Sequence, residues 1–154
     1  MTKKGGSPPG GGTDRGAPAA DGLPGRLRLE SADVERERGS RVRVGVDLTL
    51  GDRSLRGEGE GVGTEMVELR LAALATLDAI HEALGRDRFR LLGIKRLHAF
   101  DADVILVVLR DGEGDGMRRL VGAVPVRSTL VGGAAAAILD ATNRILTQPP
   151  ESDF

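Results

Sequence analysis

An internal repeat constrains the fold of this chain more than any other feature of its sequence. Residues 75–84 read Ala-Thr-Leu-Asp-Ala-Ile-His-Glu-Ala-Leu, and residues 137–146 read Ala-Ile-Leu-Asp-Ala-Thr-Asn-Arg-Ile-Leu. The two segments share five residues in register, and position 75 corresponds to position 137, an offset of 62. At the same offset Arg26–Leu29 matches Arg88–Leu91, and a run of alternate valines matches a similar aliphatic run: Val42, Val44 and Val46 with Val104, Leu106 and Val108. The repeat predicts one structural unit present in two copies.

The first copy has the pattern of three strands followed by a helix. Residues 26–30 and 41–50 alternate apolar with charged or polar side chains, which is typical of half-buried strands. A glycine-containing turn then predicts that residues 55–63 return as a hairpin partner. For the helix that follows, Thr64 is a suitable N-cap and Gly85 can end it. The expected buried stripe of this helix is Met66, Val67, Leu74, Leu77, Ile80 and Leu84.

The second copy repeats the order of strands. Its first strand is expected to contain a bulge at Gly93. Residues 104–109 are apolar without alternation, which favours a strand that is covered on both faces. Residues 120–126 form the expected third strand, with Pro125 at its end because proline has no N–H to donate to a neighbouring strand.

The last helix is rich in small residues. Ser128 or Thr129 is expected to cap it, and the glycines and alanines of its first turns allow close packing. The repeat-related acids Asp78 and Asp140 are expected on solvated helix faces. The expected buried stripe is Leu130, Ala134, Ala137, Ile138, Ala141 and Ile145.

The order β-β-β-α therefore occurs twice, and the expected fold class is α+β. The folded part spans residues 26–147 as copies 26–85 and 88–147, and about 60 residues per copy is marginal for an independent core, so the copies are expected to share one. The helices should cover the apolar face of antiparallel sheet, either as one six-stranded layer or as two small sheets related by a pseudo-twofold axis. Residues 1–25 are rich in Gly and Pro and are expected to be disordered, and residues 148–154 are expected to be frayed.

The composition narrows the classes of function. Lys and Arg total 22 against 23 Asp and Glu, a formal net charge of −1, so no overall field attracts nucleic acid or an anionic membrane. The chain has no Cys, Trp or Tyr, which removes disulfides, thiolate chemistry and most aromatic stacking on bases. No apolar stretch approaches the roughly 18 residues of a membrane span, and the N-terminus lacks the apolar core of a secretory signal. A cytoplasmic protein without membrane partners is therefore expected, and nucleic acid is disfavoured.

No motif assembles an active site. The glycine run 57–63 precedes a helix but has neither G-x-G-x-x-G spacing nor the Lys of a P-loop, although backbone N–H groups beside a helix start would suit a carboxylate. Asp111 begins a partial calcium-loop pattern whose twelfth position is Gly122 rather than Glu. His81 and His98 have no second histidine at ligand spacing, and no serine has a G-x-S-x-G setting. We therefore expect no enzyme, no metal site and no cofactor.

Six arginines are placed on expected strands, where they could line one basic sheet surface: Arg26, Arg28, Arg41, Arg43, Arg88 and Arg90. Such a surface would bind RNA through its phosphates alone. Glu30, Glu35 and Asp47 are interleaved with the arginines, which favours an ordinary solvated face. Weak RNA binding stays open as an alternative function.

Several motifs together resemble a known family. They are the duplicated β-β-β-α order, the run Gly-Glu-Gly-Val-Gly at 59–63 before a helix, and the segments Val121-Gly-Ala-Val-Pro-Val-Arg-Ser-Thr-Leu and Ile138-Leu-Asp-Ala-Thr-Asn-Arg. Over residues 26–147 the chain resembles the C-terminal regulatory domain of the α-isopropylmalate synthase and citramalate synthase family. The second helix of that domain commonly ends in an Ala-x-Asn-Arg-like run, which is Ala141–Arg144 here. The catalytic barrel of those enzymes has no counterpart in the sequence, so a stand-alone regulatory module is expected.

The resemblance implies a homodimer that binds an end-product branched-chain amino acid between the glycine-rich ends of the two copies. The leading hypothesis is a non-catalytic module that senses a small amino-acid-like carboxylate and acts on a partner protein. The alternatives are a structural or adaptor protein that reuses the fold without a ligand, and RNA binding by the arginine surface. Carried over by motif, the expected ligand-binding residues are Gly59, Gly61, Gly63, Thr64, Gly122, Pro125, Ser128 and Thr129.

Overall fold

The computed structural model of the chain describes residues 22–113 and 118–147. The segments 1–21 and 148–154, on which most of the expected disorder and fraying falls, lie outside the described residues, as do residues 114–117. In chain order the elements are strand β2 (Leu27–Arg36), a 3₁₀ turn (Arg38–Ser40), strands β3 (Arg41–Leu50) and β4 (Arg53–Val62), helix α1 (Glu65–Leu84), strands β5 (Phe89–Ala99), β6 (Ala102–Asp111) and β7 (Arg119–Pro125), and helix α2 (Leu130–Leu146).

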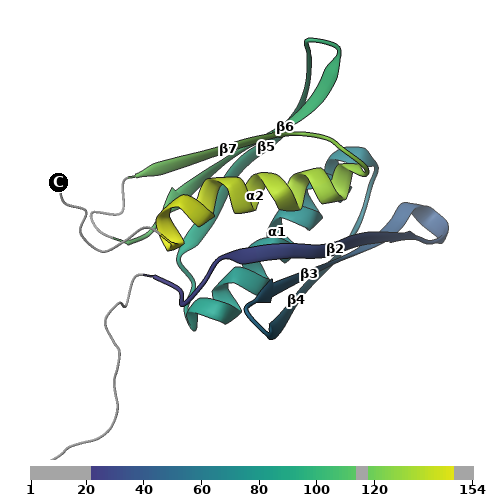
Figure 1. Cartoon of the computed structure of the whole chain (residues 1–154). Coiled ribbons are helices and arrows are strands. Elements are labelled where there is room, and N and C mark those ends of the chain that lie inside the picture. The colour runs from purple at the N-terminus through teal and green to yellow at the C-terminus, as the bar shows by residue number, and fades with distance from the viewer. Residues whose placement is uncertain (1–21, 114–117, 148–154) are drawn as a thin grey trace, which may run out of the picture.

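Each copy forms its own three-stranded antiparallel sheet. The first sheet has the order β2-β3-β4, and the second has the order β5-β6-β7. The two helices lie between the sheets, so the molecule has three layers (Figure 1). Of the two arrangements that the sequence left open, the structure has the two small sheets rather than one six-stranded layer. The α+β class and the β-β-β-α duplication are confirmed.

The first strand of each copy packs against the helix of the other copy. β2 contacts α2, and β5 contacts α1. The side-chain amide of Asn143 donates to the carbonyl of Leu27 (3.1 Å), and the main-chain N–H of Phe89 donates to Nε2 of His81 (3.0 Å). These two bonds are equivalent by the repeat, because position 81 corresponds to 143 and position 27 to 89. In each bond the helix of one copy contacts the first strand of the other, as a pseudo-twofold relation between the copies requires.

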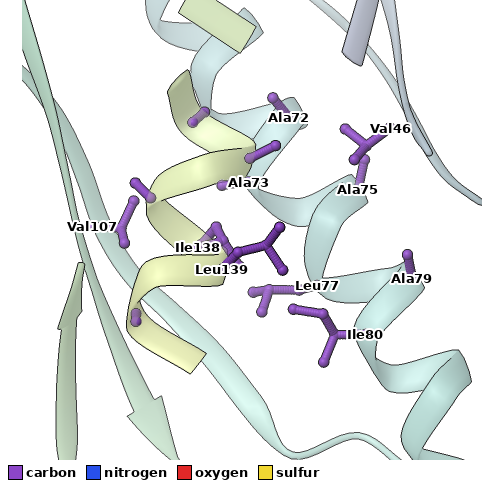
Figure 2. Packing of buried hydrophobic residues seen from close by; sticks show 14 of the residues in the cluster. Val46, Ala72, Ala73, Ala75, Leu77, Ala79, Ile80, Val107, Ile138 and Leu139 are labelled. Atoms are coloured by element: carbon purple, nitrogen blue, oxygen red, sulfur yellow. The ribbon is translucent and has the colours of Figure 1, made fainter. Parts of the chain in front are cut away.

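The shared core lies where the two helices meet between the sheets (Figure 2). Both helices contribute buried alanines beside larger side chains such as Ile80 of α1 and Ile138 of α2, which lets the helices pack closely. The expected stripe of α1 is wrong at Met66 and Leu74, which are 50% and 40% exposed. The reason is that α1 is enclosed by its own sheet, by α2 and by β5, so after Glu65 its exposed residues form a line four apart: Met66, Arg70, Leu74, Asp78 and Glu82.

Two glycines let each helix lie directly on its own sheet. A Cβ at Gly57 would overlap the carbonyl oxygen of Ala75, and a Cβ at Gly122 would overlap that of Ala137. The helix positions 75 and 137 keep the offset of 62, whereas the strand positions 57 and 122 differ by 65. The strand offset is larger because the β6–β7 connection is longer than the β3–β4 turn. The offset returns to 62 because α1 begins ten residues before Ala75, whereas α2 begins seven residues before Ala137. The prediction that the glycine face of β4 admits a close neighbour is confirmed, and that neighbour is α1.

Several local predictions are confirmed. β5 has its register shift at Gly93, and Pro125 is the last residue of β7. Gly85 ends α1 in the left-handed conformation, with φ 79°. The hydroxyl of Thr129 accepts a hydrogen bond from the N–H of Gly132 and so caps α2.

Candidate functional site

A cavity of about 500 Å³ opens where both helices begin. The end of β2, the 3₁₀ turn, the end of β4 and the first turns of α1 and α2 surround it. Residues from the two copies therefore meet in one place, which we call the helix-start cavity. Its lining is Arg36, Glu37, Ser40, Val42, Gly63, Thr64, Glu65, Glu68 and Leu130.

The junction between β4 and α1 is tied to the 3₁₀ turn. The N–H of Gly63 donates to the carbonyl of Ser40 (3.0 Å). Gly63 has φ 155°, and a Cβ there would overlap the side chain of Val67. A glycine is therefore required to turn the chain from the strand into the helix at the cavity wall.

The start of α1 offers hydrogen-bond donors to the cavity. Thr64 is the N-cap, as predicted, and its carbonyl accepts from the N–H of Glu68 (3.0 Å). In the described residues its side chain makes no capping hydrogen bond, in contrast to Thr129 at the start of α2. The first N–H groups of a helix have no partner within the helix and carry a partial positive charge. This end of the cavity can therefore accept a carboxylate.

An arginine is fixed at the rim of the same cavity. Arg36 donates twice to the carboxylate of Glu68, at 2.7 and 2.8 Å. The side chain of Glu68 is 8% exposed and that of Arg36 is 65% exposed, so the acid anchors the base at the surface. Hydrogen bonding to Glu68, and then its negative charge, raise the pKa of Arg36. A guanidinium has five N–H donors, so this pair leaves donors that can face a ligand.

Acidic and apolar groups complete the lining. Glu65 is engaged by Arg96 of β5 at 2.8 Å, whereas Glu37 stands exposed at the rim and forms no ion pair within the described part of the chain. Val42 and Leu130 supply apolar surface beside these charges. Donors, a carboxylate and aliphatic side chains in one cavity suit a small zwitterion with an aliphatic side chain.

The structure places two of the eight expected site residues, Gly63 and Thr64, in the helix-start cavity. Gly59 and Gly61 lie beneath the side chain of Leu71, with Cβ positions 3.3 to 3.4 Å from its atoms, so α1 covers them.

The four expected residues of the second copy do not line the cavity. Gly122 is covered by Ala137 and Ala141 of α2, and Pro125 is exposed at the end of β7. Thr129 is engaged in capping α2, and Ser128 precedes it. The second copy contributes its next residue, Leu130, instead.

Sequence reasoning missed the other seven cavity residues: Arg36, Glu37, Ser40, Val42, Glu65, Glu68 and Leu130. The sequence placed Glu68 in the first turn of α1, where an acid is favoured by the helix dipole, but it did not indicate that this acid lines a cavity. Nothing local marks Arg36, which is 32 residues away from its partner. Its role depends on how β2 is placed against α1.

The expected basic sheet surface is wrong at Arg88. This side chain is 3% exposed and binds Asp111 through Nε (2.9 Å) and Nη2 (3.1 Å). Arg118 donates to the same carboxylate at 2.8 Å, as does the N–H of Glu113 at 3.0 Å. These bonds outweigh burial and lower the pKa of Asp111 to about 2. Arg88 therefore holds the end of β6 to the start of β5 and is not available to phosphates.

The outer face of the first sheet is a network of ion pairs. Arg56 binds Asp47 at 2.7 Å and Glu58 at 2.8 Å, and it lies over Gly45, where a Cβ would overlap its guanidinium. Arg43 of the expected basic surface binds Glu60 at 2.7 Å. This face is neutralised by its own acids, as the solvated-face interpretation expected.

A smaller cavity of about 360 Å³ lies between α1 and β5, beside His81. The imidazole stacks on Phe89 with ring centroids 6.1 Å apart and accepts the main-chain N–H of that residue. Burial lowers the pKa of His81, which keeps the ring neutral as an acceptor. The structure thus gives His81 a packing role at the boundary of the core, as its isolation in the sequence suggested.

The chain matches no protein-family model and, at a significant level, no curated protein. Neither described helix combines the length and the apolar composition that a bilayer-spanning segment needs. Within the described residues, no cluster of three His, Asp or Glu side chains is arranged to hold a metal ion.

Proposed function

We propose that the protein is a non-catalytic, dimeric sensing module that binds a small amino-acid-like carboxylate, such as a branched-chain amino acid, in the helix-start cavity. The observation that carries this proposal is the convergence of both copies on one mixed-charge cavity at an uncapped helix start. The motif resemblance to regulatory domains of the α-isopropylmalate synthase and citramalate synthase family points to the same ligand class. A conformational response at this junction would be passed to a partner protein.

The chemistry of the lining assigns each part of the ligand to a group. The ligand carboxylate faces the N–H groups at the start of α1 and the open donors of Arg36. The ligand ammonium faces Glu37, and the aliphatic side chain lies against Val42 and Leu130. Gly63 allows the backbone to approach the ligand without a side chain in between.

Thermal unfolding with leucine, isoleucine, valine and their keto acids tests this proposal. A ligand present at 100 times its Kd adds about 2.7 kcal/mol of stability by mass action. We expect the amino acids to raise Tm more than the keto acids, because only the amino acids carry the ammonium that faces Glu37. Glu37→Gln should abolish that difference, and Glu30→Gln on the outer face of the first sheet is the matched control. Absence of a shift with every compound would contradict ligand sensing and leave the structural or adaptor function.

A further inference from the structure

The outer face of the second sheet differs from that of the first. The middle strand β6 contributes Val104, Leu106 and Val108 to it. Pairing in register places Leu97 and Pro125 beside Val104, Lys95 and Ala123 beside Leu106, and Gly93 and Val121 beside Val108. Val104, Leu106 and Val108 are only half-buried, so the expectation that residues 104–109 are covered on both faces is not met within one chain. Their flanking neighbours Leu97 and Val121 are 38% and 51% exposed.

One end of this face carries an arginine row. Arg90 pairs in register with Arg110, and Arg110 pairs with Arg119, so three guanidinium groups stand side by side on neighbouring strands. Like charges directly opposite each other on a sheet are destabilising. Within the described residues none of the three forms an ion pair, in contrast to Arg43 and Arg56 on the outer face of the first sheet. The row therefore has no counter-charge among the described residues of one chain.

The other end of the face carries the complementary groups. Phe100 is fully exposed at the β5–β6 turn, and it adopts the left-handed conformation with φ 54°, as does Asp101 with φ 61°. Phe100 and Asp101 form the two-residue connection between the paired residues Ala99 and Ala102, and hairpin connections of this length favour positive φ at their central residues. Asp101 is exposed and unpaired within the described residues. In Figure 1 this hairpin tip rises away from the helical layer, on the outer side of the sheet.

We infer that two copies of the chain pack the outer faces of their second sheets against each other, with a twofold axis passing near Leu106. Along β6 this residue lies midway between the arginine row at Arg110 and the hairpin tip. A twofold operation therefore brings the arginine row of each copy to Phe100 and Asp101 of the other. Guanidinium groups then meet a carboxylate and an aromatic face, and the aliphatic side chains of the two β6 strands bury each other. This inference rests on the dimeric part of the proposed function and specifies its surface.

The size of the face sets the expected strength of the dimer. Three strands about 4.8 Å apart and about nine residues long give a face on the order of 14 by 30 Å. This is roughly half of the area that each partner buries in a standard interface. We therefore expect a reversible dimer that dissociates on dilution.

Sedimentation equilibrium of the full chain and charge-reversal variants tests the arrangement. Asp101→Lys and Arg110→Glu should each weaken dimerisation at least about tenfold, because each places like charges together at two symmetric contacts. An equimolar mixture of the two variants should regain the wild-type dimer, since both contacts of the heterodimer then join opposite charges. Native mass spectrometry identifies that heterodimer by its mass.

Two apolar-to-acid variants test whether the dimer forms through this face of the second sheet. Leu106→Glu should give a monomer with unchanged Tm, whereas Val62→Glu, an exposed apolar position on the first sheet, should leave the dimer intact. A wild-type chain that is monomeric at every concentration would overturn the inference. A dimer that persists in Leu106→Glu, or a mixture that does not recover, would do the same. Ligand-induced stabilisation measured on the Leu106→Glu monomer reports on the helix-start cavity separately, so failure of one proposal is distinguishable from failure of the other.

Discussion

The side-chain amide of Asn143 donates a 3.1 Å hydrogen bond to the carbonyl of Leu27, a residue 116 positions earlier in the chain. Asn143 is 3% exposed and Leu27 is 1% exposed, so water cannot replace the bond. It joins the last helix to the first strand and closes the two copies around one core. The equivalent bond between His81 and Phe89 joins the same positions of the repeat in the middle of the chain.

Asn143→Ala should destabilise the fold by about 1–3 kcal/mol, because the buried carbonyl of Leu27 would lose its donor. Urea denaturation followed by circular dichroism measures this change. Glu82→Ala, at an exposed position of α1, is the control and should stay within about 0.5 kcal/mol of the wild type. Equal stability of both variants would show that the bond does not hold the copies together.

Gly122→Ala should be severely destabilising, by several kcal/mol, because the new Cβ would overlap the carbonyl of Ala137 and push α2 off its sheet. The same holds for Gly57→Ala beneath Ala75. Gly93→Ala is the matched control within a strand, since nothing lies within 4 Å of its Cβ position. Thermal unfolding of the three variants should give two strongly lowered Tm values and one near that of the wild type.

Gly45→Ala should be mild although its Cβ would also overlap another group. That group is the guanidinium of Arg56, the far end of a flexible and exposed side chain that can move aside. The loss is confined to surface ion pairs, which contribute less than about 1 kcal/mol. A loss as large as that of Gly57→Ala, measured by the same denaturation, would contradict this account of the outer face.

The stability of the fold should decrease in acid through Asp111. Its pKa is lowered to about 2, so the stabilisation is complete above the ordinary carboxyl pKa near 4 and is lost as the pH falls from there through about 2. The shift corresponds to about 2 kcal/mol at 1.36 kcal/mol per pKa unit. Measuring the free energy of unfolding from pH 6 down to pH 2 should show this decrease.

Asp111→Asn should remove that component of the pH dependence and destabilise the protein by about 3–5 kcal/mol at neutral pH, because the buried Arg88 loses its carboxylate. Arg118→Gln removes a partly exposed member of the same cluster and should cost much less. If Asp111→Asn retained the acid-dependent loss, other carboxylates would be its source.

Local sequence patterns were sufficient for the secondary structure and for the existence of the duplication, but not for its register in the middle strands. The offset of 62 matches Val44 and Val46, which are buried on the inner face of β3, with Leu106 and Val108, which lie on the outer face of β6. Alternation over 41–50 gave β3 at its observed bounds, and Thr64 and Gly85 gave both ends of α1. Local patterns did not predict the burial of a side chain that faces an element far away in the chain. Met66 and Leu74 have helical apolar spacing but lie on the open side of α1, and Arg88 resembles its exposed neighbours in sequence but is buried against Asp111.

The candidate site also contains residues that local sequence patterns indicated and residues that only the tertiary structure brings together. The glycine run at the end of β4 and the start of α1 was visible in the sequence, and the structure places Gly63 and Thr64 at the helix-start cavity. Gly59 and Gly61 have the same local pattern, but α1 covers them. Arg36, Glu68 and Leu130 enter the cavity only because β2 and both helix starts meet there.

The sequence by itself determined the helices and strands, their order and their duplication. Each of these depends on the spacing of apolar residues, on turn residues and on helix caps, which involve only a few neighbouring residues. Tertiary structure alone decided that each copy keeps its own sheet, that the first strand of one copy lies on the helix of the other, and which charges are buried. These outcomes depend on close packing between segments that are distant in the chain, and on whether a charged group finds its partner across that distance.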